Sequence, residues 1–99
     1  MTVHVMINYS VAPDQVDTNE VAVAAFIAEA KAAADGSYEY SSFRTGDASF
    51  VHLGRFADDA AVKRFQSLPG FGDFAAGLKA RAIEGPNAAR PALVATTRD

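Results

Sequence analysis

The sequence contains no cysteine and no tryptophan, and only two of its 99 residues are histidines. Without cysteine the chain has no disulfide, no thiolate nucleophile and no thiolate ligand for a metal. The histidines, His4 and His52, show neither His-x-His nor His-x-x-x-His spacing, and no third ligand stands out beside them. The glycines form no loop of the kind that cradles phosphate. We therefore predict neither a metal site nor a nucleotide site.

Positive charge is also scarce, because 9 Lys and Arg residues stand against 12 Asp and Glu residues, for a formal net charge of -3 at pH 7. A nucleic-acid-binding protein is expected to present a clustered basic face instead. The most apolar stretch, residues 21–34, is interrupted by Glu29 and Lys31 and is too short to cross a bilayer. The N-terminus lacks the basic and apolar regions of a secretory signal. We therefore expect a cytoplasmic protein that binds neither nucleic acid nor a membrane.

Length and composition indicate a single folded domain over residues 1–99. The chain is 49% hydrophobic and 21% charged, which is typical of globular proteins. A domain this short buries only about two thirds of the surface that its unfolded chain exposes. A second chain that covers further apolar surface would therefore stabilise it.

The first half of the sequence predicts a strand followed by a helix. Residues 3–11 alternate apolar and polar side chains with the period of a strand. Asp17 and Glu20 then fit a capping box, and the helix that follows is expected to end near Gly36. Its apolar stripe consists of residues at helical spacing: Val16, Val23, Phe26, Ile27, Ala30 and Ala34.

The second half predicts a hairpin, a bent helix and a last strand. Residues 38–44 and 49–56 are strand-like and are joined by a short connection that contains Gly46. Asp58 is expected to cap a helix that bends at Pro69-Gly70 and continues as far as Gly85-Pro86. Residues 91–96 are short and rich in β-forming residues, so we expect the last strand there.

The order of these elements is βαββαβ, which is the ferredoxin-like arrangement of an antiparallel sheet with both helices on one face. We expect Val51 and Leu53 to face the helices together with the apolar residues of the first strand. The opposite face would then display His4, Met6, Asn8, Tyr38 or Tyr40, Phe50, His52 and Phe56. Such a face is too apolar to stay in contact with water, so it should be an interface or a ligand site.

Several segments together resemble a known superfamily over nearly the whole chain. They are Tyr38-Glu39-Tyr40 to Arg44, Ser49-Phe50-Val51-His52-Leu53, and Leu68-Pro69-Gly70-Phe71 with Phe65 and Phe74. This pattern resembles the dimeric α+β barrel superfamily and, within it, the antibiotic biosynthesis monooxygenase-like proteins. The resemblance implies a homodimer in which two ferredoxin-like sheets form a barrel.

The best-known members of that group oxidise polycyclic quinols with dioxygen and without flavin, haem or metal, so the resemblance implies that no cofactor is needed. Those enzymes use a tryptophan and an asparagine near the substrate, whereas this chain has no tryptophan. The superfamily also contains isomerases, dehydratases and sensing domains. The fold alone therefore does not determine the reaction.

Candidate catalytic residues lie on the face that we expect to be uncovered. His52 and His4 fall on neighbouring strands, and neutral imidazole can accept a proton near pH 7. Asn8 could donate a hydrogen bond to an oxyanion, and Tyr40 could orient a phenolic substrate. Met6, Phe50 and Phe56 would form an apolar wall for the substrate. Each histidine could equally be a structural hydrogen-bonding residue at a dimer interface, and the aromatic residues could simply form the core.

Two functions from different classes follow from these observations. The first is a cofactor-independent monooxygenase acting on a small aromatic or polyketide-like quinol, with His52 as the base and Asn8 as the oxyanion donor. The second is a non-catalytic dimeric module that binds a small ligand or serves in assembly. In both cases the expected partners are a second copy of the chain and a small apolar or aromatic ligand.

Overall fold

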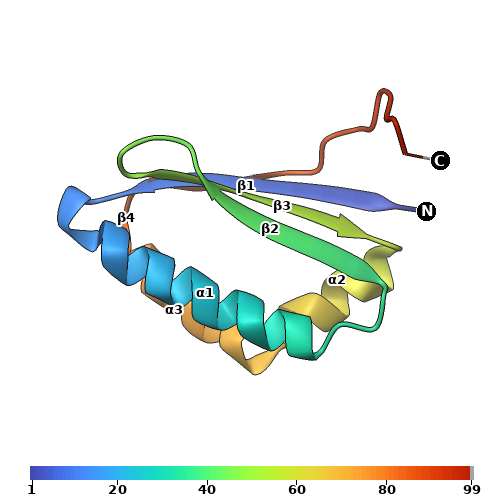
Figure 1. Ribbon diagram of the computed structural model, residues 1–99, viewed down its shortest axis with the longest axis horizontal. Helices are drawn as coiled ribbons and strands as arrows, with labels where there is room; N and C mark the ends of the chain where they lie inside the picture. Colours follow the sequence, from blue (N-terminus) through green and yellow to red (C-terminus); the bar gives the residue numbers. More distant parts are fainter. Residues whose placement is uncertain (99) are drawn as a thin grey trace.

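The computed structural model describes residues 1–98, which form an antiparallel sheet with helices on one face (Figure 1). Along the chain the elements are β1 (Val3–Val11), the 3-10 turn η1 (Pro13–Gln15), α1 (Val16–Ala32), β2 (Tyr38–Arg44), β3 (Ser49–Phe56), α2 (Asp59–Gln66), α3 (Pro69–Arg81) and β4 (Ala82–Ala89). The predicted ferredoxin-like α+β fold is confirmed. Within residues 1–98 no helix combines the length and the apolar character needed to cross a membrane.

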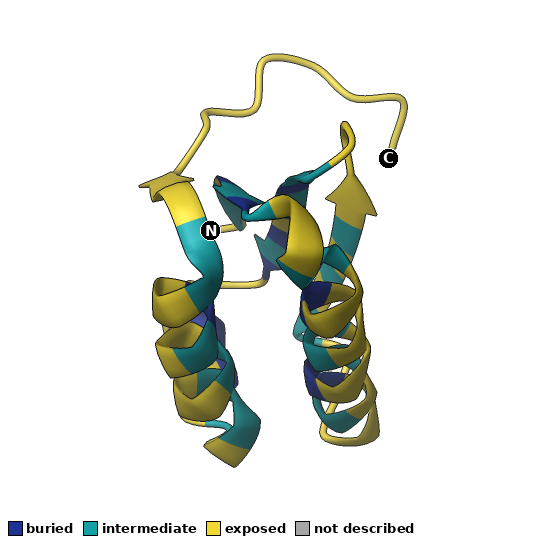
Figure 2. Ribbon diagram, turned by 90° about the vertical axis from the view of Figure 1, so that its left-hand side faces the viewer, coloured by how far each residue is buried: buried dark blue, intermediate teal, exposed yellow. Residues whose placement is uncertain are grey.

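The sheet has the strand order β2-β3-β1-β4, and every pair of neighbouring strands is antiparallel. The register between β1 and β3 sets Val3 opposite Phe56 and Ile7 opposite His52. Because side chains opposite each other in register lie on the same face, these residues share the face that the helices cover. Buried positions concentrate where the sheet and the helices meet (Figure 2).

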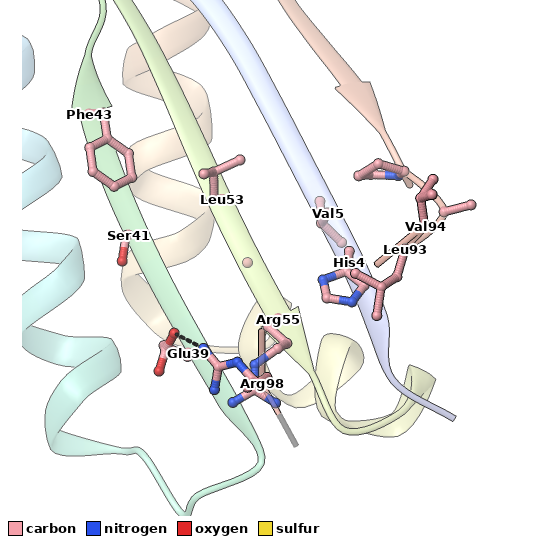
Figure 3. Close-up of a pocket in the computed structure, with 13 residues that line it drawn as sticks. His4, Val5, Glu39, Ser41, Phe43, Leu53, Arg55, Leu93, Val94 and Arg98 are labelled. Atoms are coloured by element: carbon pink, nitrogen blue, oxygen red, sulfur yellow. Dashed lines mark ion pairs between the residues drawn. The ribbon is translucent and has the colours of Figure 1, made fainter. Parts of the chain in front are cut away.

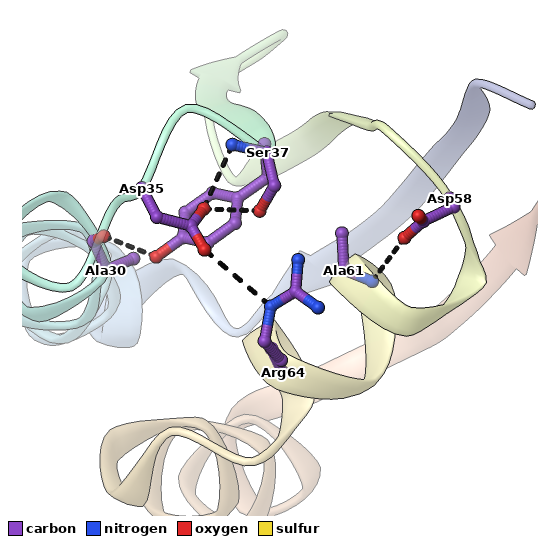
Figure 4. Close-up of polar contacts among 7 residues, drawn as sticks. Ala30, Asp35, Ser37, Asp58, Ala61 and Arg64 are labelled. Carbon is purple, nitrogen blue, oxygen red and sulfur yellow. Dashed lines mark hydrogen bonds and ion pairs between the residues drawn. The ribbon is translucent and has the colours of Figure 1, made fainter.

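The helix starts follow from local chemistry, with one difference from the predictions. Asp58 caps α2 as expected, because its side chain accepts the Ala61 N–H at 2.8 Å (Figure 4). The predicted cap at Asp17 is wrong: α1 begins at Val16, and its N-cap residue Gln15 makes no side-chain hydrogen bond. Pro13 already starts the η1 turn just before α1, since proline favours the first position of a helical turn.

The last strand is β4, and the predicted strand at residues 91–96 is wrong. We expected Gly85-Pro86 to end a helix, yet both residues lie inside β4. An edge strand tolerates proline because the missing N–H faces no partner strand. Gly85 has φ of 75° and lies so close to β1 that an added Cβ would be 2.8 Å from the Asn8 carbonyl oxygen. This position therefore requires glycine.

The core consists of two adjoining clusters between the sheet and the helices. One cluster contains Phe26, Ala30, Phe56, Ala61, Val62 and Phe65, and the other contains Tyr9, Val11, Phe50 and Leu78. Phe74 of α3 packs against both clusters. This arrangement corrects the predicted orientation of β3, because Phe50, His52 and Phe56 face the helices while Leu53 is 44% exposed on the other face.

The orientation of β3 follows from the side chains on its two faces. The face that we expected to be covered carries Val51 and Leu53, but it also carries Arg55, whose charge must reach water. The other face carries two phenylalanines, which bury more apolar area than a valine and a leucine do. A shift of one residue exchanges the two faces completely, so the phenylalanines determine the outcome.

Candidate functional site

His52 lies at the centre of the candidate site, beneath the helices and only 2% exposed. The Tyr9 hydroxyl on β1 is 2.9 Å from its Nε2, and the Tyr40 hydroxyl on β2 is 3.0 Å from its Nδ1. Both tyrosine rings meet the imidazole edge to face, and the ring of Phe74 lies 5.6 Å away. The imidazole is therefore held by polar partners on both sides within an aromatic enclosure.

The hydrogen bonds continue from Tyr9 to both long helices. The Asn19 side-chain amide on α1 donates to the Tyr9 hydroxyl at 2.9 Å. Arg81, the last residue of α3, donates to Asn19 Oδ1 through Nε and one terminal nitrogen at 3.2 and 3.0 Å. We call Tyr40, His52, Tyr9, Asn19 and Arg81 the His52 network. Buried polar groups are costly unless they are hydrogen-bonded, and this network satisfies them jointly.

The electrostatics of the site follow from its burial. Burial lowers the pKa of His52 from 6.5 to about 4, so the imidazole is neutral at pH 7. Burial, together with the nearby Tyr9, raises the pKa of Tyr40. Burial also raises the pKa of Tyr9, although the Asn19 hydrogen bond and the Arg81 charge act in the opposite direction. Both phenols therefore keep their protons at neutral pH.

Cavities border both ends of the His52 network. At one end Tyr40 lines a groove of about 460 Å³ between α1 and β2, which we call the α1–β2 groove. Its other lining residues are Glu20, Val23, Ala24, Ile27, Ser41, Ser42, Phe43, Arg44 and Phe50. At the other end Arg81 lines a smaller cavity of about 260 Å³ between α1 and α3, together with Phe26 and Phe74. Tyr40 is thus the member of the network that borders the larger space.

The other two predicted catalytic residues, His4 and Asn8, lie on the opposite side of the sheet from His52. In the register of β1 with β3, His4 is paired with Arg55, Met6 with Leu53 and Asn8 with Val51. Strand alternation puts these pairs on the outer face. The predicted single site containing His52, His4 and Asn8 is therefore wrong, because the sheet separates His52 from the other two. Of the predicted substrate-binding residues, Tyr40, Phe50 and Phe56 lie on the helix side and Met6 lies on the outer face.

The outer face has a cavity of its own, also about 460 Å³, beneath the C-terminal segment (Figure 3). Phe43 and Leu53 of the sheet line it together with Leu93 and Val94 of that segment. His4 and Arg55 also contribute, and Arg98 forms an exposed ion pair with Glu39 at 3.5 Å. We call this region the outer sheet face. Phe43, Leu53, Leu93 and Val94 are 44 to 96% exposed there, whereas Tyr9 and Phe50 on the His52 side of the sheet are 3% exposed.

Three members of the His52 network were not predicted from the sequence. Asn19 did leave a signal, because it stands on the apolar stripe of the first helix between Val16 and Val23, where a polar residue needs a buried partner. Tyr9 shares the parity of Val5 and Ile7, which indicated burial without indicating a partner. Arg81 left no signal, since a basic residue near a helix C-terminus is usual.

The fold and the enclosed network define a small α+β protein of ferredoxin-like topology with a polar site between its sheet and its helices. Sequence comparison is more specific: residues 2–77 match the family described as antibiotic biosynthesis monooxygenase. The chain belongs to this family, and the resemblance inferred from the sequence is confirmed. No curated protein matches the chain in sequence.

Solved structures show the same fold at low sequence identity. Rv0793 from Mycobacterium tuberculosis is 15% identical with a TM-score of 0.84, and the alignment covers 99% of this chain and 100% of that protein. PA3566 from Pseudomonas aeruginosa is 20% identical with a TM-score of 0.79, and the alignment covers 95% of each chain. A mutant of SnoaB, a cofactor-independent oxygenase from Streptomyces nogalater, is 21% identical with a TM-score of 0.69, and the alignment covers 99% of this chain and 98% of SnoaB.

Proposed function

We propose that this protein is a cofactor-independent monooxygenase that oxidises a small aromatic or polyketide-like quinol with dioxygen. Membership of the antibiotic biosynthesis monooxygenase family supports the class of reaction. The observation that carries the proposal is the position of Tyr40, whose hydroxyl contacts the buried His52 and which is one of the residues that line the α1–β2 groove.

The α1–β2 groove suits a flat substrate that bears oxygen atoms. Its volume of about 460 Å³ lies within the range of about 300 to 1,000 Å³ that is usual for ligand sites. Val23 and Ile27 of α1 form one apolar wall, and Phe43 and Phe50 contribute aromatic surface. Arg44 and Tyr40 also line the groove and are the donors that this proposal assigns to the substrate oxygens, although Arg44 also forms an exposed ion pair with Glu20 at 3.5 Å.

In this proposal Tyr40 is the residue that contacts the substrate. Direct proton abstraction by His52 would need a free ring nitrogen, yet both nitrogens already contact tyrosine hydroxyls. Tyr40 instead donates a hydrogen bond to a phenolic oxygen of the bound quinol and stabilises the ionised form, whose proton passes to solvent water. His52 holds Tyr40 in place from behind. The ionised quinol is the electron-rich species that reacts with dioxygen.

The reaction balances without an external reductant. A quinol that carries a free ring C–H reacts with one dioxygen to give a hydroxyquinone and one water. One oxygen atom enters a new C–O bond, the other leaves as water, and the substrate supplies all four electrons. The two hydrogens in the water come from substrate hydrogens, by exchange with solvent.

We further propose that the protein acts as a homodimer joined through the outer sheet face. Phe43 and Leu53 are 51% and 44% exposed there, and Leu93 and Val94 of the C-terminal segment are also exposed. A contiguous apolar surface of this kind is typical of an interface. Phe50 and Phe56, which we expected on this surface, are buried in the core and cannot contribute to it.

Oxygen uptake in the presence of a panel of polycyclic quinols tests the catalytic proposal. We expect the protein to consume dioxygen, and we expect product formed under ¹⁸O₂ to contain one labelled oxygen atom. Tyr40→Phe should lower kcat/KM by about 10²-fold, the scale seen when an oxyanion donor is removed. Tyr38→Phe is the matched control, because Tyr38 lies on the same strand and its hydroxyl donates to the Ala30 carbonyl oxygen instead.

The non-catalytic alternative rests on the same site. A histidine that is 2% exposed with both ring nitrogens engaged is also what a purely structural residue looks like. Absence of oxygen uptake with every quinol, or equal activity of the Tyr40→Phe variant and the wild-type protein, would contradict the enzyme proposal. Binding of the quinols without turnover would then favour the ligand-binding module.

A further inference from the structure

The chemistry of Arg81 fixes the orientation of the Asn19 side chain. A guanidinium group has N–H donors and no acceptor. Two of its nitrogen atoms lie 3.2 and 3.0 Å from the same atom of Asn19, so that atom must be the carbonyl oxygen. The amide nitrogen of Asn19 consequently faces Tyr9, 2.9 Å from its hydroxyl oxygen.

The orientation of Asn19 in turn fixes the proton of Tyr9. The Tyr9 oxygen accepts the hydrogen bond from Asn19, so its own proton needs an acceptor. Tyr9 is 3% exposed, and the remaining hydrogen-bond partner of its hydroxyl within residues 1–98 is His52 Nε2 at 2.9 Å. If His52 Nε2 carried the proton instead, the Tyr9 hydroxyl would be a buried donor without an acceptor. Tyr9 therefore donates to His52.

A neutral imidazole carries one proton, so an accepting Nε2 leaves that proton on Nδ1. His52 Nδ1 lies 3.0 Å from the Tyr40 oxygen and donates to it. Because Tyr40 accepts this hydrogen bond, its own hydroxyl proton is not engaged by His52. We propose that Arg81, acting through Asn19 and Tyr9, is a positioning residue that fixes His52 as the Nδ1–H tautomer and leaves the Tyr40 proton available to a ligand in the α1–β2 groove.

All hydrogen bonds of the His52 network then point the same way, from the cationic Arg81 to Tyr40. Each donated bond polarises the next group, so Tyr40 becomes a stronger donor than an isolated phenol. A strong donor at the groove selects ligands that present an anionic or carbonyl oxygen, such as an ionised quinol. This preference rests on the proposed function, whereas the tautomer of His52 does not.

Nuclear magnetic resonance of ligand-free protein containing ¹⁵N-labelled histidine tests the tautomer directly. Long-range proton–nitrogen correlations distinguish a protonated ring nitrogen from an unprotonated one, and only His4 and His52 contribute signals. We expect His52 to show a protonated Nδ1 and an unprotonated Nε2 at pH 7. A protonated Nε2 in the wild-type protein would overturn the proposal, and this outcome requires no variant to fold.

Asn19→Asp tests whether the network sets the tautomer. The carboxylate has nearly the same shape as the amide but only accepts hydrogen bonds. It therefore accepts a hydrogen bond from the Tyr9 hydroxyl as well as those from Arg81. Tyr9 must then accept from His52, and we expect the tautomer to change to Nε2–H. Asn87→Asp on the exposed part of β4 is the matched control and should keep Nδ1–H.

A folded Asn19→Asp variant that retains Nδ1–H would overturn the coupling between the network and His52. Kinetics separate this result from the proposed function. If the quinols are oxidised, Asn19→Asp should lower kcat by about tenfold or more, because Tyr40 then donates to His52 instead of to the substrate. If no quinol is oxidised, the proposed reaction fails, while the tautomer measurement still supports or overturns the positioning role of Arg81.

Discussion

In the folded protein the His52 imidazole contacts two tyrosine hydroxyl groups in place of water, and this change of surroundings determines its charge. Water stabilises the protonated form of histidine, whereas the aromatic enclosure formed by Tyr9, Tyr40 and Phe74 does not. The pKa of His52 therefore falls to about 4. A neutral imidazole can both donate and accept, which is why it can link two tyrosines in one network.

The low pKa of His52 predicts how stability depends on pH. Between about pH 6.5 and pH 4 the unfolded chain binds a proton at His52 that the folded protein does not bind. The free energy of unfolding should therefore decrease as the pH falls through this range, by up to about 3 kcal/mol. Above pH 6.5 this contribution is fully present. Urea unfolding at several pH values between 4 and 7.5 measures the slope.

His52→Asn provides the control for that slope, because asparagine does not titrate. We expect the variant to be less stable at pH 7 but to lose less stability on acidification than the wild-type protein. The carboxylates are unchanged in both proteins, so their contributions cancel in the comparison. Equal slopes in the two proteins would mean that folding leaves the pKa of His52 unchanged, so that it takes up its proton in the folded state over the same pH range as in the unfolded chain.

Asn19 is the residue through which α1 and α3 share the polar network. Asn19→Leu keeps the approximate volume but leaves the Arg81 guanidinium without its acceptor and Tyr9 without its donor. The loss of these partners by the buried Tyr9 and the half-buried Arg81 should cost about 2 to 4 kcal/mol of unfolding free energy. Denaturant unfolding measures the loss, with the exposed Asn87→Leu as the control. A loss below 1 kcal/mol for Asn19→Leu would show that water replaces the missing partners.

At the scale of elements, the sequence predicts the order of most helices and strands but not which face of β3 is buried. The order of the first six helices and strands, from β1 to α3, follows from periodicity, capping and turn residues, and the orientation of β1 was predicted correctly. Both faces of β3 carry large apolar side chains, so the alternation of its sequence alone could not show which face is buried. The buried face is determined by Phe50 and Phe56 packing against helices that are distant in sequence. The network around His52 depends on that orientation and could not be predicted without it.

Gly54 marks the crowded face of β3 and offers a test of its packing. An added Cβ would lie 2.6 Å from Phe56 Cε2 and 2.9 Å from Tyr40 Cδ1. Gly54→Ala should therefore destabilise the protein by about 1 to 3 kcal/mol. It should also displace Tyr40 from His52, which a change in the His52 imidazole signals would report.

The control for Gly54 is Gly72 in α3, where an added Cβ meets no atom within 4 Å. Gly72→Ala should stabilise the protein by up to about 1 kcal/mol, because alanine favours a helix more than glycine does. Opposite signs for the two substitutions, measured by thermal or urea unfolding, are expected from the packing. A neutral or stabilising effect of Gly54→Ala would contradict the described contacts of Tyr40 and Phe56.

At the scale of the whole molecule, the sheet has one covered face and one open face. The helices cover the face that carries His52, while the C-terminal segment passes over the other face (Figures 1 and 3). Burying the exposed Phe43, Leu53 and Leu93 would contribute roughly 1.5 to 3 kcal/mol for each side chain that becomes fully buried. The outer sheet face therefore contains the apolar surface that the core of so short a chain cannot accommodate.

The homodimer proposal predicts a mass in solution and a specific way to change it. Light scattering at micromolar concentration should give twice the mass of one chain, because obligate interfaces commonly bury more than about 2,000 Å² and do not dissociate readily.

Leu53→Glu should yield folded monomers, since Leu53 is 44% exposed within one chain and its replacement leaves the core intact. Val21→Glu is the control, because Val21 is 72% exposed on α1 and the dimer should persist. Phe56→Glu should instead unfold the chain, since Phe56 is only 2% exposed. A wild-type protein that is monomeric and stable under the same conditions would show that the outer sheet face tolerates water and that the proposed interface does not form.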